Sequence, residues 1–116
     1  MPYIRVAGSQ NWTEEQMTCL KAGLAQATML IPGKTEAALM IELDDGRDMY
    51  FQGVKRELAY VDAKFSGTIE LAYKQRFTEA VFKLLNEICG LADDAVYVTI
   101  SEFAEWGTHG ELKVRK

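Results

Sequence analysis

The chain carries the order strand, helix, strand twice, and this repeat restricts the possible folds more than any other feature. The four segments with a strand pattern are residues 3–7, 37–43, 59–65 and 95–103. A helical spacing of apolar residues lies between the members of each pair, and it ends at Pro32-Gly33 in the first half and at Gly90 in the second. Two βαβ units in one small domain predict parallel pairing within each unit. We therefore expect an α+β domain in which two βαβ units, related by a pseudo-twofold axis, form a four-stranded sheet with both helices on one face.

Local signals support each predicted helix. Thr13 followed by Gln16 forms a potential capping box at the start of the first helix. The apolar positions expected to face the core are Leu20, Leu24, Ala27 and Ile31 in the first helix, and Tyr73, Phe77, Val81, Leu84 and Ile88 in the second. After a turn at Asp44-Asp45-Gly46, residues 48–53 are expected to form a short strand opposite residues 37–43.

Two helices on one face leave the other face of the sheet uncovered. We expect that face to be apolar and the chain to associate with copies of itself in a closed assembly. One interpretation of the Leu112–Val114 tail is that it pairs with the edge of a neighbouring subunit.

The composition limits the class of protein. With 116 residues the chain is expected to be a single domain, residues 1–116. A net charge of −4 argues against a nucleic-acid or anionic-membrane partner, and the basic tail, residues 113–116, is too short to form a patch. No apolar run approaches the ~20 residues of a membrane span. Cys19 and Cys89 are expected to be buried and reduced, which favours a cytoplasmic location. The single histidine and scattered carboxylates show no metal-ligand spacing.

Pro2 is unusual because it stands at the head of both a strand and the chain. Removal of the initiator methionine would give Pro2 a free secondary amine. An ordinary α-amino group titrates near ~7.7–8, and burial or a nearby cation lowers that pKa. A neutral amine of this kind can act as a general base or a nucleophile. The alternative is that Pro2 only begins a strand.

Several short motifs, in order along the chain, carry a family resemblance. They are Met1-Pro2, Pro32-Gly33-Lys34, Tyr50-Phe51-Gln52-Gly53, Lys64-Phe65-Ser66-Gly67, Ala95-Val96-Tyr97-Val98 after Asp93-Asp94, and Trp106-Gly107. With them the chain resembles, over nearly its full length, the tautomerase superfamily and in particular the group around macrophage migration inhibitory factor (MIF), phenylpyruvate tautomerase and D-dopachrome tautomerase. The resemblance implies trimers built around a barrel of three sheets, with pockets between subunits and the amino-terminal proline at the base of each pocket.

The resemblance also implies roles for individual residues. Pro2 matches the catalytic base, Lys34 matches a lysine that binds the substrate carboxylate, and Tyr97 matches a pocket tyrosine from an adjacent subunit. The remaining predicted substrate-binding residues are Ser66 through its backbone, Tyr3 beside the base, Thr99 where well-known animal members have asparagine, and Trp106 near the pocket mouth. Without the resemblance, Lys34 would be interpreted as a solvated lysine and Tyr97 as a surface residue. His109 is interpreted as a solvated loop residue or a ligand for an acid substrate.

Together these features predict a cofactor-independent tautomerase, an isomerase that interconverts the keto and enol forms of a small α-keto acid such as a phenylpyruvate-like compound. The altered residues 106–110 predict weak activity on large aromatic substrates. The alternative is a non-catalytic trimeric binding protein of the same fold. It would apply if Met1 stays attached, because the nitrogen of Pro2 would then be an amide.

Overall fold

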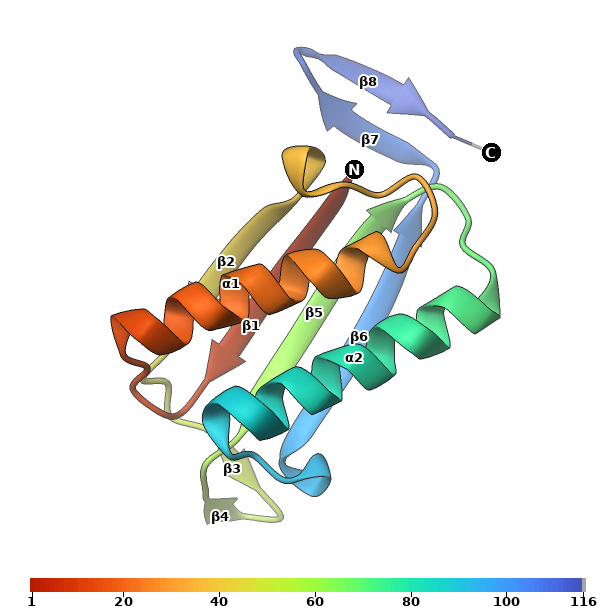
Figure 1. Ribbon diagram of the computed structural model, residues 1–116. Coiled ribbons are helices and arrows are strands. Elements are labelled where there is room, and N and C mark those ends of the chain that lie inside the picture. The colour runs from red at the N-terminus through yellow and green to blue at the C-terminus, as the bar shows by residue number, and fades with distance from the viewer. Residues whose placement is uncertain (116) are drawn as a thin grey trace.

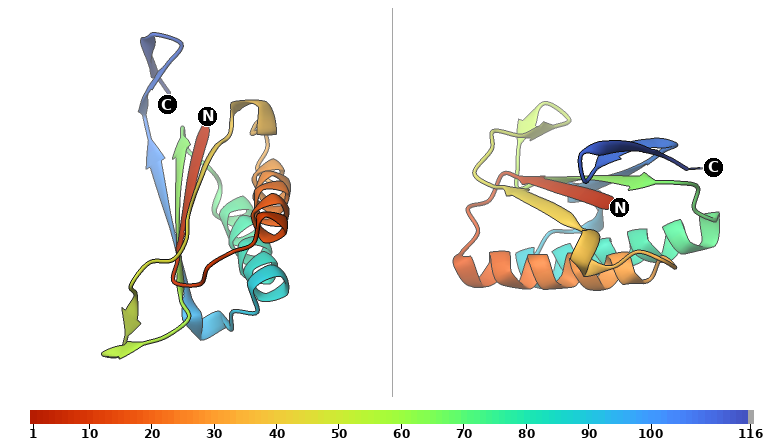
Figure 2. Two further views of the ribbon diagram at one scale, coloured as in Figure 1. Left: turned by 90° about the vertical axis from the view of Figure 1, so that its left-hand side faces the viewer. Right: turned by 90° about the horizontal axis from the view of Figure 1, so that it is seen from above.

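Two helices cover one face of a four-stranded sheet in the computed structural model, which describes residues 1–115 (Figures 1 and 2). The strands of this sheet are β1 (Pro2–Gly8), β2 (Met40–Asp44), β5 (Ala59–Ser66) and β6 (Val96–Phe103), in the order β2-β1-β5-β6. The pairs β1–β2 and β5–β6 are parallel, and the central pair β1–β5 is antiparallel. The predicted arrangement of two βαβ units with both helices on one face is therefore confirmed.

The helix signals act as predicted. Helix α1 (Glu14–Met29) begins after Thr13, where the Gln16 N–H donates to Thr13 Oγ1 (3.1 Å) and the Thr13 N–H donates to Gln16 Oε1 (2.9 Å). Helix α2 (Leu71–Cys89) ends at Gly90, which has a left-handed backbone with a φ of 66°. Short 3-10 turns, η1 (Glu36–Ala38) and η2 (Asp93–Ala95), precede β2 and β6.

The core lies between the sheet and the helices. Its centre is the Phe65 ring on β5, which meets the Phe77 ring on α2 edge to face with centroids 5.4 Å apart. Of the stripe predicted for α2, Phe77 and Val81 are fully buried, and Tyr73, Leu84 and Ile88 are half-buried against the core. The buried positions of the helix continue through Leu85 and Cys89. Leu84 lies in the contact between the helices, against Gly23 of α1, where an added Cβ would be 2.2 Å from Leu84 Cδ1.

Two hairpins that the sequence did not predict extend from the four-stranded sheet. Strand β3 (Tyr50–Phe51) pairs with β4 (Val54–Lys55), so the prediction that residues 48–53 lie opposite residues 37–43 is wrong. Strand β7 (Glu105–Thr108) pairs with β8 (Glu111–Val114). Each hairpin has two central residues with positive φ, Gln52-Gly53 and His109-Gly110, as a tight two-residue turn requires. The strand predicted at 37–43 also begins later, at Met40, because residues 36–38 form the turn η1.

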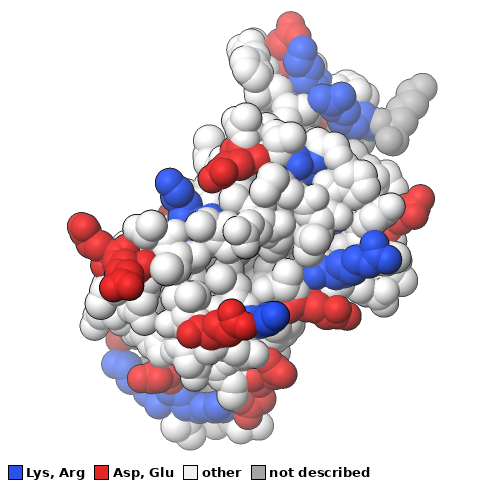
Figure 3. Space-filling view, in the orientation of Figure 1, with Lys and Arg blue, Asp and Glu red and all other residues white. Residues whose placement is uncertain are grey.

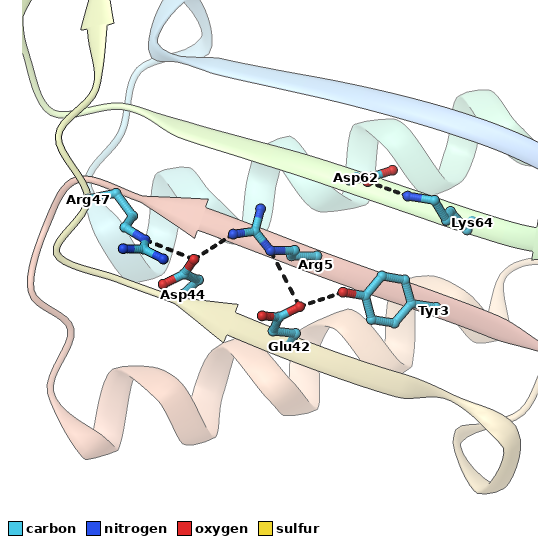
Figure 4. A network of polar contacts seen from close by, with 7 residues as sticks. All are labelled: Tyr3, Arg5, Glu42, Asp44, Arg47, Asp62 and Lys64. Carbon is cyan, nitrogen blue, oxygen red and sulfur yellow. Dashed lines mark hydrogen bonds and ion pairs between the residues drawn. The ribbon is translucent and has the colours of Figure 1, made fainter.

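The uncovered face of the sheet is polar, so the prediction of an apolar face is wrong. Figure 4 shows Arg5 of β1 between two carboxylates of β2, with Nη2 2.5 Å from Asp44 Oδ2 and Nε 3.4 Å from Glu42 Oε1. On β5, Lys64 Nζ lies 2.5 Å from Asp62 Oδ2. The strict alternation of β1 and β5 explains this pattern, since it sends their apolar side chains to the helices and their charged ones to the open face. The large exposed apolar residues lie on the edge strands and hairpins and at the ends of the helices: Met40, Tyr50, Val54, Tyr97, Phe103, Leu112 and Val114, together with Met29, Leu30 and Leu71.

The cysteines differ from each other. Both are free, and Cys89 is buried as predicted, but Cys19 is exposed. Cys19 lies on the solvent side of α1, next to the buried Leu20.

Neither helix of the described residues is long and apolar enough to cross a membrane. Lys116, the last residue of the basic tail, lies outside the described residues.

Candidate functional site

The amino-terminal end of β1 meets the carboxyl ends of β5 and β6 at one corner of the molecule (Figure 1). Pro2 is buried there and lies opposite Phe65 in the β1–β5 ladder. The Ser66 N–H donates a hydrogen bond to the carbonyl oxygen of Met1 at 3.1 Å. The first residues of the chain are therefore held against the end of β5 by main-chain contacts. We call this region the amino-terminal corner and define it by Met1, Pro2, Lys34 and Ser66.

Lys34 reaches the amino-terminal corner from the segment after α1. The chain turns there, with the Lys34 N–H donating to the carbonyl of Ile31 at 3.2 Å. Its side chain then extends to the end of β5, where Nζ donates to the Ser66 carbonyl oxygen at 2.8 Å. The backbone of Ser66 thus makes two contacts, because its N–H binds Met1 and its carbonyl oxygen binds Lys34. Gly67 follows with a φ of 85°, a left-handed conformation that favours glycine. A cavity of about 170 Å³ lies beside Lys34, lined also by Ile69 and Tyr73.

The electrostatics of the corner favour a neutral amine. The pKa of the Met1 amino group is lowered from 8.0 to about 6, first by burial, then by the positive charge of Lys34 and a hydrogen bond with it, and finally by the charge of Arg115. The pKa of Lys34 is also lowered, mainly by burial. The nitrogen of Pro2 belongs to the Met1–Pro2 peptide bond in this structure. The amine whose pKa is lowered by burial and by Lys34 in this structure is therefore that of Met1.

Tyr97 and Thr99 lie away from the corner within one chain. Tyr97 pairs with Tyr60, five residues along β5 from Phe65, which is about 16 Å at the usual rise of a strand. Its side chain is 63% exposed and its ring meets the Phe51 ring edge to face at 5.8 Å. Thr99 Oγ1 lies 2.6 Å from the Tyr60 hydroxyl on the open face. Neither side chain can join Pro2 unless a second chain supplies it.

Three further predicted residues, Tyr3, Trp106 and His109, lie outside the amino-terminal corner. Tyr3 follows Pro2, but its side chain turns to the open face, where its hydroxyl donates to Glu42 at 2.5 Å (Figure 4). This hydrogen bond to the Glu42 carboxylate raises the pKa of Tyr3. The Trp106 ring lies 6.1 Å from the Phe103 ring, at the point where β6 passes into the hairpin. His109 lies in the turn at the tip, with Nδ1 3.1 Å from Thr108 Oγ1.

A larger cavity lies at the opposite end of the sheet. It has a volume of about 560 Å³, and its lining includes Gln10, Trp12, Arg47 and Lys55. Its basic residues are already paired, Arg47 with Asp44 at 2.9 Å and Lys55 with Asp48 at 2.9 Å. Residues predicted from the sequence to be functional do not line it. We therefore place the candidate site at the amino-terminal corner, where an amine of lowered pKa and a lysine meet.

One residue of the corner was missed by the sequence reasoning. Arg115 lies near enough to lower the pKa of both the Met1 amine and Lys34. The sequence predicts that the basic tail is too short to form a patch and that residues 112–114 pair with a neighbouring subunit, and no local pattern indicates that Arg115 lies beside Gly67. Within residues 1–115, the structure contains no group of three or more His, Cys, Asp and Glu side chains suited to holding a metal ion.

Solved structures of MIF homologues and of a fused tautomerase superpose on this chain. Leishmania major MIF2 superposes with a TM-score of 0.89 and 21% identity over 97% of each chain. The MIF homologue from Prochlorococcus marinus gives 0.84 and 24% identity, over 95% of this chain and 97% of that one. A fused 4-oxalocrotonate tautomerase, solved as an asymmetric trimer, gives 0.85 and 17% identity over 94% of each chain. Neither a family model nor a curated protein matches the sequence. The chain has the tautomerase/MIF fold, and the predicted resemblance is confirmed at the level of the fold.

Proposed function

We propose that this protein is a cofactor-independent tautomerase that interconverts the keto and enol forms of a small α-keto acid, with Pro2 as the general base after removal of Met1. One observation carries the proposal: the Met1 amino group at this corner is partly buried beside Lys34, and its pKa is lowered to about 6. The Pro2 amine, once Met1 is removed, is expected to experience the same burial and the same charge. An amine with that pKa is mostly neutral at pH 7, so it can accept a proton. The tautomerase fold of the chain agrees with this assignment.

The chemistry requires only a proton transfer. The neutral Pro2 amine takes a proton from the carbon next to the substrate carbonyl, which leaves an enolate and a protonated amine. The ammonium then returns the proton to the enolate oxygen and gives the enol. Lys34 binds the substrate carboxylate and disfavours a second positive charge on the amine.

Removal of Met1 would also free a hydrogen-bond donor. The Ser66 N–H donates to the Met1 carbonyl oxygen at 3.1 Å, and this acceptor leaves with Met1. Because a buried donor without a partner is unfavourable, a substrate oxygen is expected to take its place. The position of the Met1 carbonyl oxygen therefore marks where a carboxylate or enolate oxygen of the substrate would bind.

We extend the proposal to a homotrimer. Exposed apolar residues at the edges of the sheet, such as Met40 and Tyr97, and on the hairpins, such as Tyr50 and Leu112, suit contacts between chains. A structurally similar tautomerase is a trimer. Assembly would bring Tyr97 of one subunit to the corner of another, where its hydroxyl could steady the enolate oxygen.

The test is turnover by protein whose intact mass confirms that Met1 is absent. Pro2→Ala keeps a primary amine but loses the ring, and we expect kcat for a small α-keto acid to fall about a hundredfold or more. Lys55→Ala is the control because Lys55 pairs with Asp48 at the opposite end of the sheet, and it should leave kcat unchanged. Turnover that Pro2→Ala leaves untouched would show that Pro2 only begins a strand. We also expect phenylpyruvate to be a poorer substrate than smaller α-keto acids.

A second function applies to protein that keeps Met1. In the structure the Met1 carbonyl is bound by Ser66 and the Pro2 nitrogen is an amide, which has no basicity. Such a chain would be a non-catalytic trimeric binding protein of the same fold. Intact mass of the natively expressed protein distinguishes the two functions.

A further inference from the structure

Residues 67–70 connect β5 to α2 and directly follow the backbone group that binds Lys34 (Figure 1). The Ser66 carbonyl oxygen, which accepts from Lys34 Nζ at 2.8 Å, and the Gly67 N–H belong to one peptide group. That N–H donates to the Phe103 carbonyl oxygen on β6 at 2.8 Å. Because a trans peptide group is planar and its N–H and carbonyl point in opposite directions, the contact with β6 sets the direction of the oxygen that holds Lys34.

Gly67 itself gives little rigidity to this peptide group. Its φ of 85° is a left-handed conformation that glycine adopts readily, and glycine has more conformational freedom than any other residue. A second attachment follows two residues later, where the Ile69 N–H donates to Glu102 Oε2 at 2.6 Å. The other oxygen of this carboxylate, Oε1, accepts from Lys74 Nζ of α2 at 2.7 Å. Glu102 therefore ties both the connecting segment and the start of α2 to β6.

The register of the sheet places Glu102 at the same end as Pro2. Glu102 lies opposite Phe65 in the β5–β6 ladder, and Phe65 lies opposite Pro2 in the β1–β5 ladder. Side chains in such a row point to the same face of the sheet, so Glu102 points to the helix side as Phe65 does. The row spans two strand spacings, about 10 Å, between Pro2 and Glu102. Glu102 can therefore act on the site only through the residues that it holds.

The carboxylate of Glu102 is ionised at neutral pH. Its pKa lies below the ordinary value because Lys74 and the Ile69 N–H both donate to it. An ionised carboxylate accepts shorter and stronger hydrogen bonds than a neutral group does. On the helix-covered face of the molecule, acidic and basic side chains are interspersed among uncharged ones (Figure 3). The contacts of Glu102 are therefore specific ones on a surface of mixed charge.

We propose that Glu102 is a positioning residue of the candidate site, which fixes residues 67–69 so that the Ser66 carbonyl oxygen holds Lys34 in place to bind the substrate carboxylate. This inference rests on the proposed tautomerase function. A merely structural role, in which Glu102 only anchors the start of α2 through Lys74, would affect stability and leave the binding of a carboxylate unchanged.

The experiment measures kcat and KM for pyruvate on protein lacking Met1, from deuterium uptake at the pyruvate methyl group in D₂O followed by NMR. Glu102→Ala removes the acceptor of the Ile69 N–H. We expect KM to rise about tenfold, since loss of a hydrogen bond to a charged group has an effect of that order. The kcat should change less than about twofold, because Pro2 stays in the β1–β5 ladder and only uniform binding of the carboxylate is lost.

Two conservative variants test the contact with Ile69 itself. Glu102→Gln keeps a side-chain oxygen for the Ile69 N–H and should restore KM to within about threefold of the parent value, since a neutral acceptor makes a weaker hydrogen bond. Glu102→Asp keeps the charge but shortens the side chain by one carbon, so KM should rise in this variant even if Glu102→Ala does not fold. Impairment of Glu102→Gln equal to that of Glu102→Ala, or an unchanged KM in Glu102→Asp, would overturn the inference.

Two controls separate positioning from anchoring of the helix. Lys74→Met removes the contact with α2 but leaves the Ile69 acceptor, and should lower the melting temperature without raising KM. Glu87→Ala removes a carboxylate that pairs with Lys83 at 3.9 Å near the other end of α2, and should leave KM unchanged. A rise of KM in Lys74→Met as large as that in Glu102→Ala would assign the effect to the helix and refute positioning.

A binding measurement separates failure of the inference from failure of the proposed function. Absence of turnover would count against the tautomerase, but NMR titration with pyruvate still reports on the carboxylate site at Lys34. Weaker pyruvate binding in Glu102→Ala that Glu102→Gln restores would support Glu102 as a positioning residue. Equal affinity of the parent protein and Glu102→Ala would refute it, and absence of pyruvate binding by the parent protein would refute both proposals.

Discussion

Replacement of Lys34 by alanine gives the most direct test of the electrostatics of the amino-terminal corner. The amine pKa of about 6 lies two units below 8.0, which corresponds to about 2.7 kcal/mol against the charged form before solvent screening is considered. Water screens this partly exposed group, so the actual energy is smaller. A unit charge at ~4 Å contributes about 1 kcal/mol in water, or ~0.7 pKa unit, and more where water is excluded. We therefore expect Lys34→Ala to raise the amine pKa from about 6 to ~7.

The value does not return to 8.0 in this variant, because burial is the largest cause of the shift and remains. The amine of Pro2, exposed after loss of Met1, lies in the same corner and is expected to show the same direction of change. Its protonation sets the acid limb of kcat/KM against pH, so that limb should move upward by about one unit. KM for carboxylate substrates should rise as well, since the ammonium that binds them is lost.

Measurement of kcat/KM from pH 5 to 9, with a parallel NMR titration of the terminal amine, tests both effects. Lys55→Ala is the matched control, because Lys55 is a lysine at the opposite end of the sheet that pairs with Asp48. It should leave the acid limb in place. An acid limb that does not move in Lys34→Ala would show that Lys34 exerts no field on the base, and the assignment of the site would fail.

The same shift has a consequence for stability. The unfolded chain binds a proton at the terminal amine near pH 8, and the folded chain binds it near pH 6. The folded state is therefore favoured above pH 8, and this contribution is lost as the pH falls through about 6. Because Lys34→Ala raises the folded-state pKa of the amine, the free energy of unfolding should change less between pH 6 and pH 8 in this variant. Thermal unfolding at several pH values would detect the difference.

Three further predictions concern assembly, packing and the thiols. Sedimentation equilibrium at micromolar concentration should give three times the chain mass of 13.0 kDa, and a stable monomer would remove the intersubunit pocket. Gly8→Ala should destabilise the fold by about 1–3 kcal/mol in chemical denaturation, because its Cβ would lie 2.3 Å from Trp12 Cζ2, whereas Gly107→Ala has open space and should not. Iodoacetamide should label Cys19 alone in the native protein, since burial raises the pKa of Cys89 to about 11; labelling of Cys89 would contradict its burial.

The sequence by itself determined the features that depend on near neighbours along the chain. Alternation in residues 3–7 and 59–65 located the two central strands, because a strand repeats its facing every two residues. Thr13 with Gln16 marked the start of α1, and Gly90 marked the end of α2, because caps are completed within one turn. The same alternation also places charged residues on the open face. Our prediction of an apolar open face was wrong because it considered only the apolar residues.

Only the tertiary structure decided which distant residues meet. The pairing of β3 with β4 and of β7 with β8 uses positive φ at Gln52 and His109, a conformation that is uncommon for residues other than glycine. Leu84 is half-buried between the two helices, where it contacts Gly23, and Leu85 takes the fully buried position. The amino-terminal corner joins residues 1, 2, 34 and 66 because β1 and β5 run antiparallel, and Arg115 lies beside it because the chain after β8 returns to Gly67. Such contacts depend on the register and direction of whole strands, and no local pattern of residues encodes them.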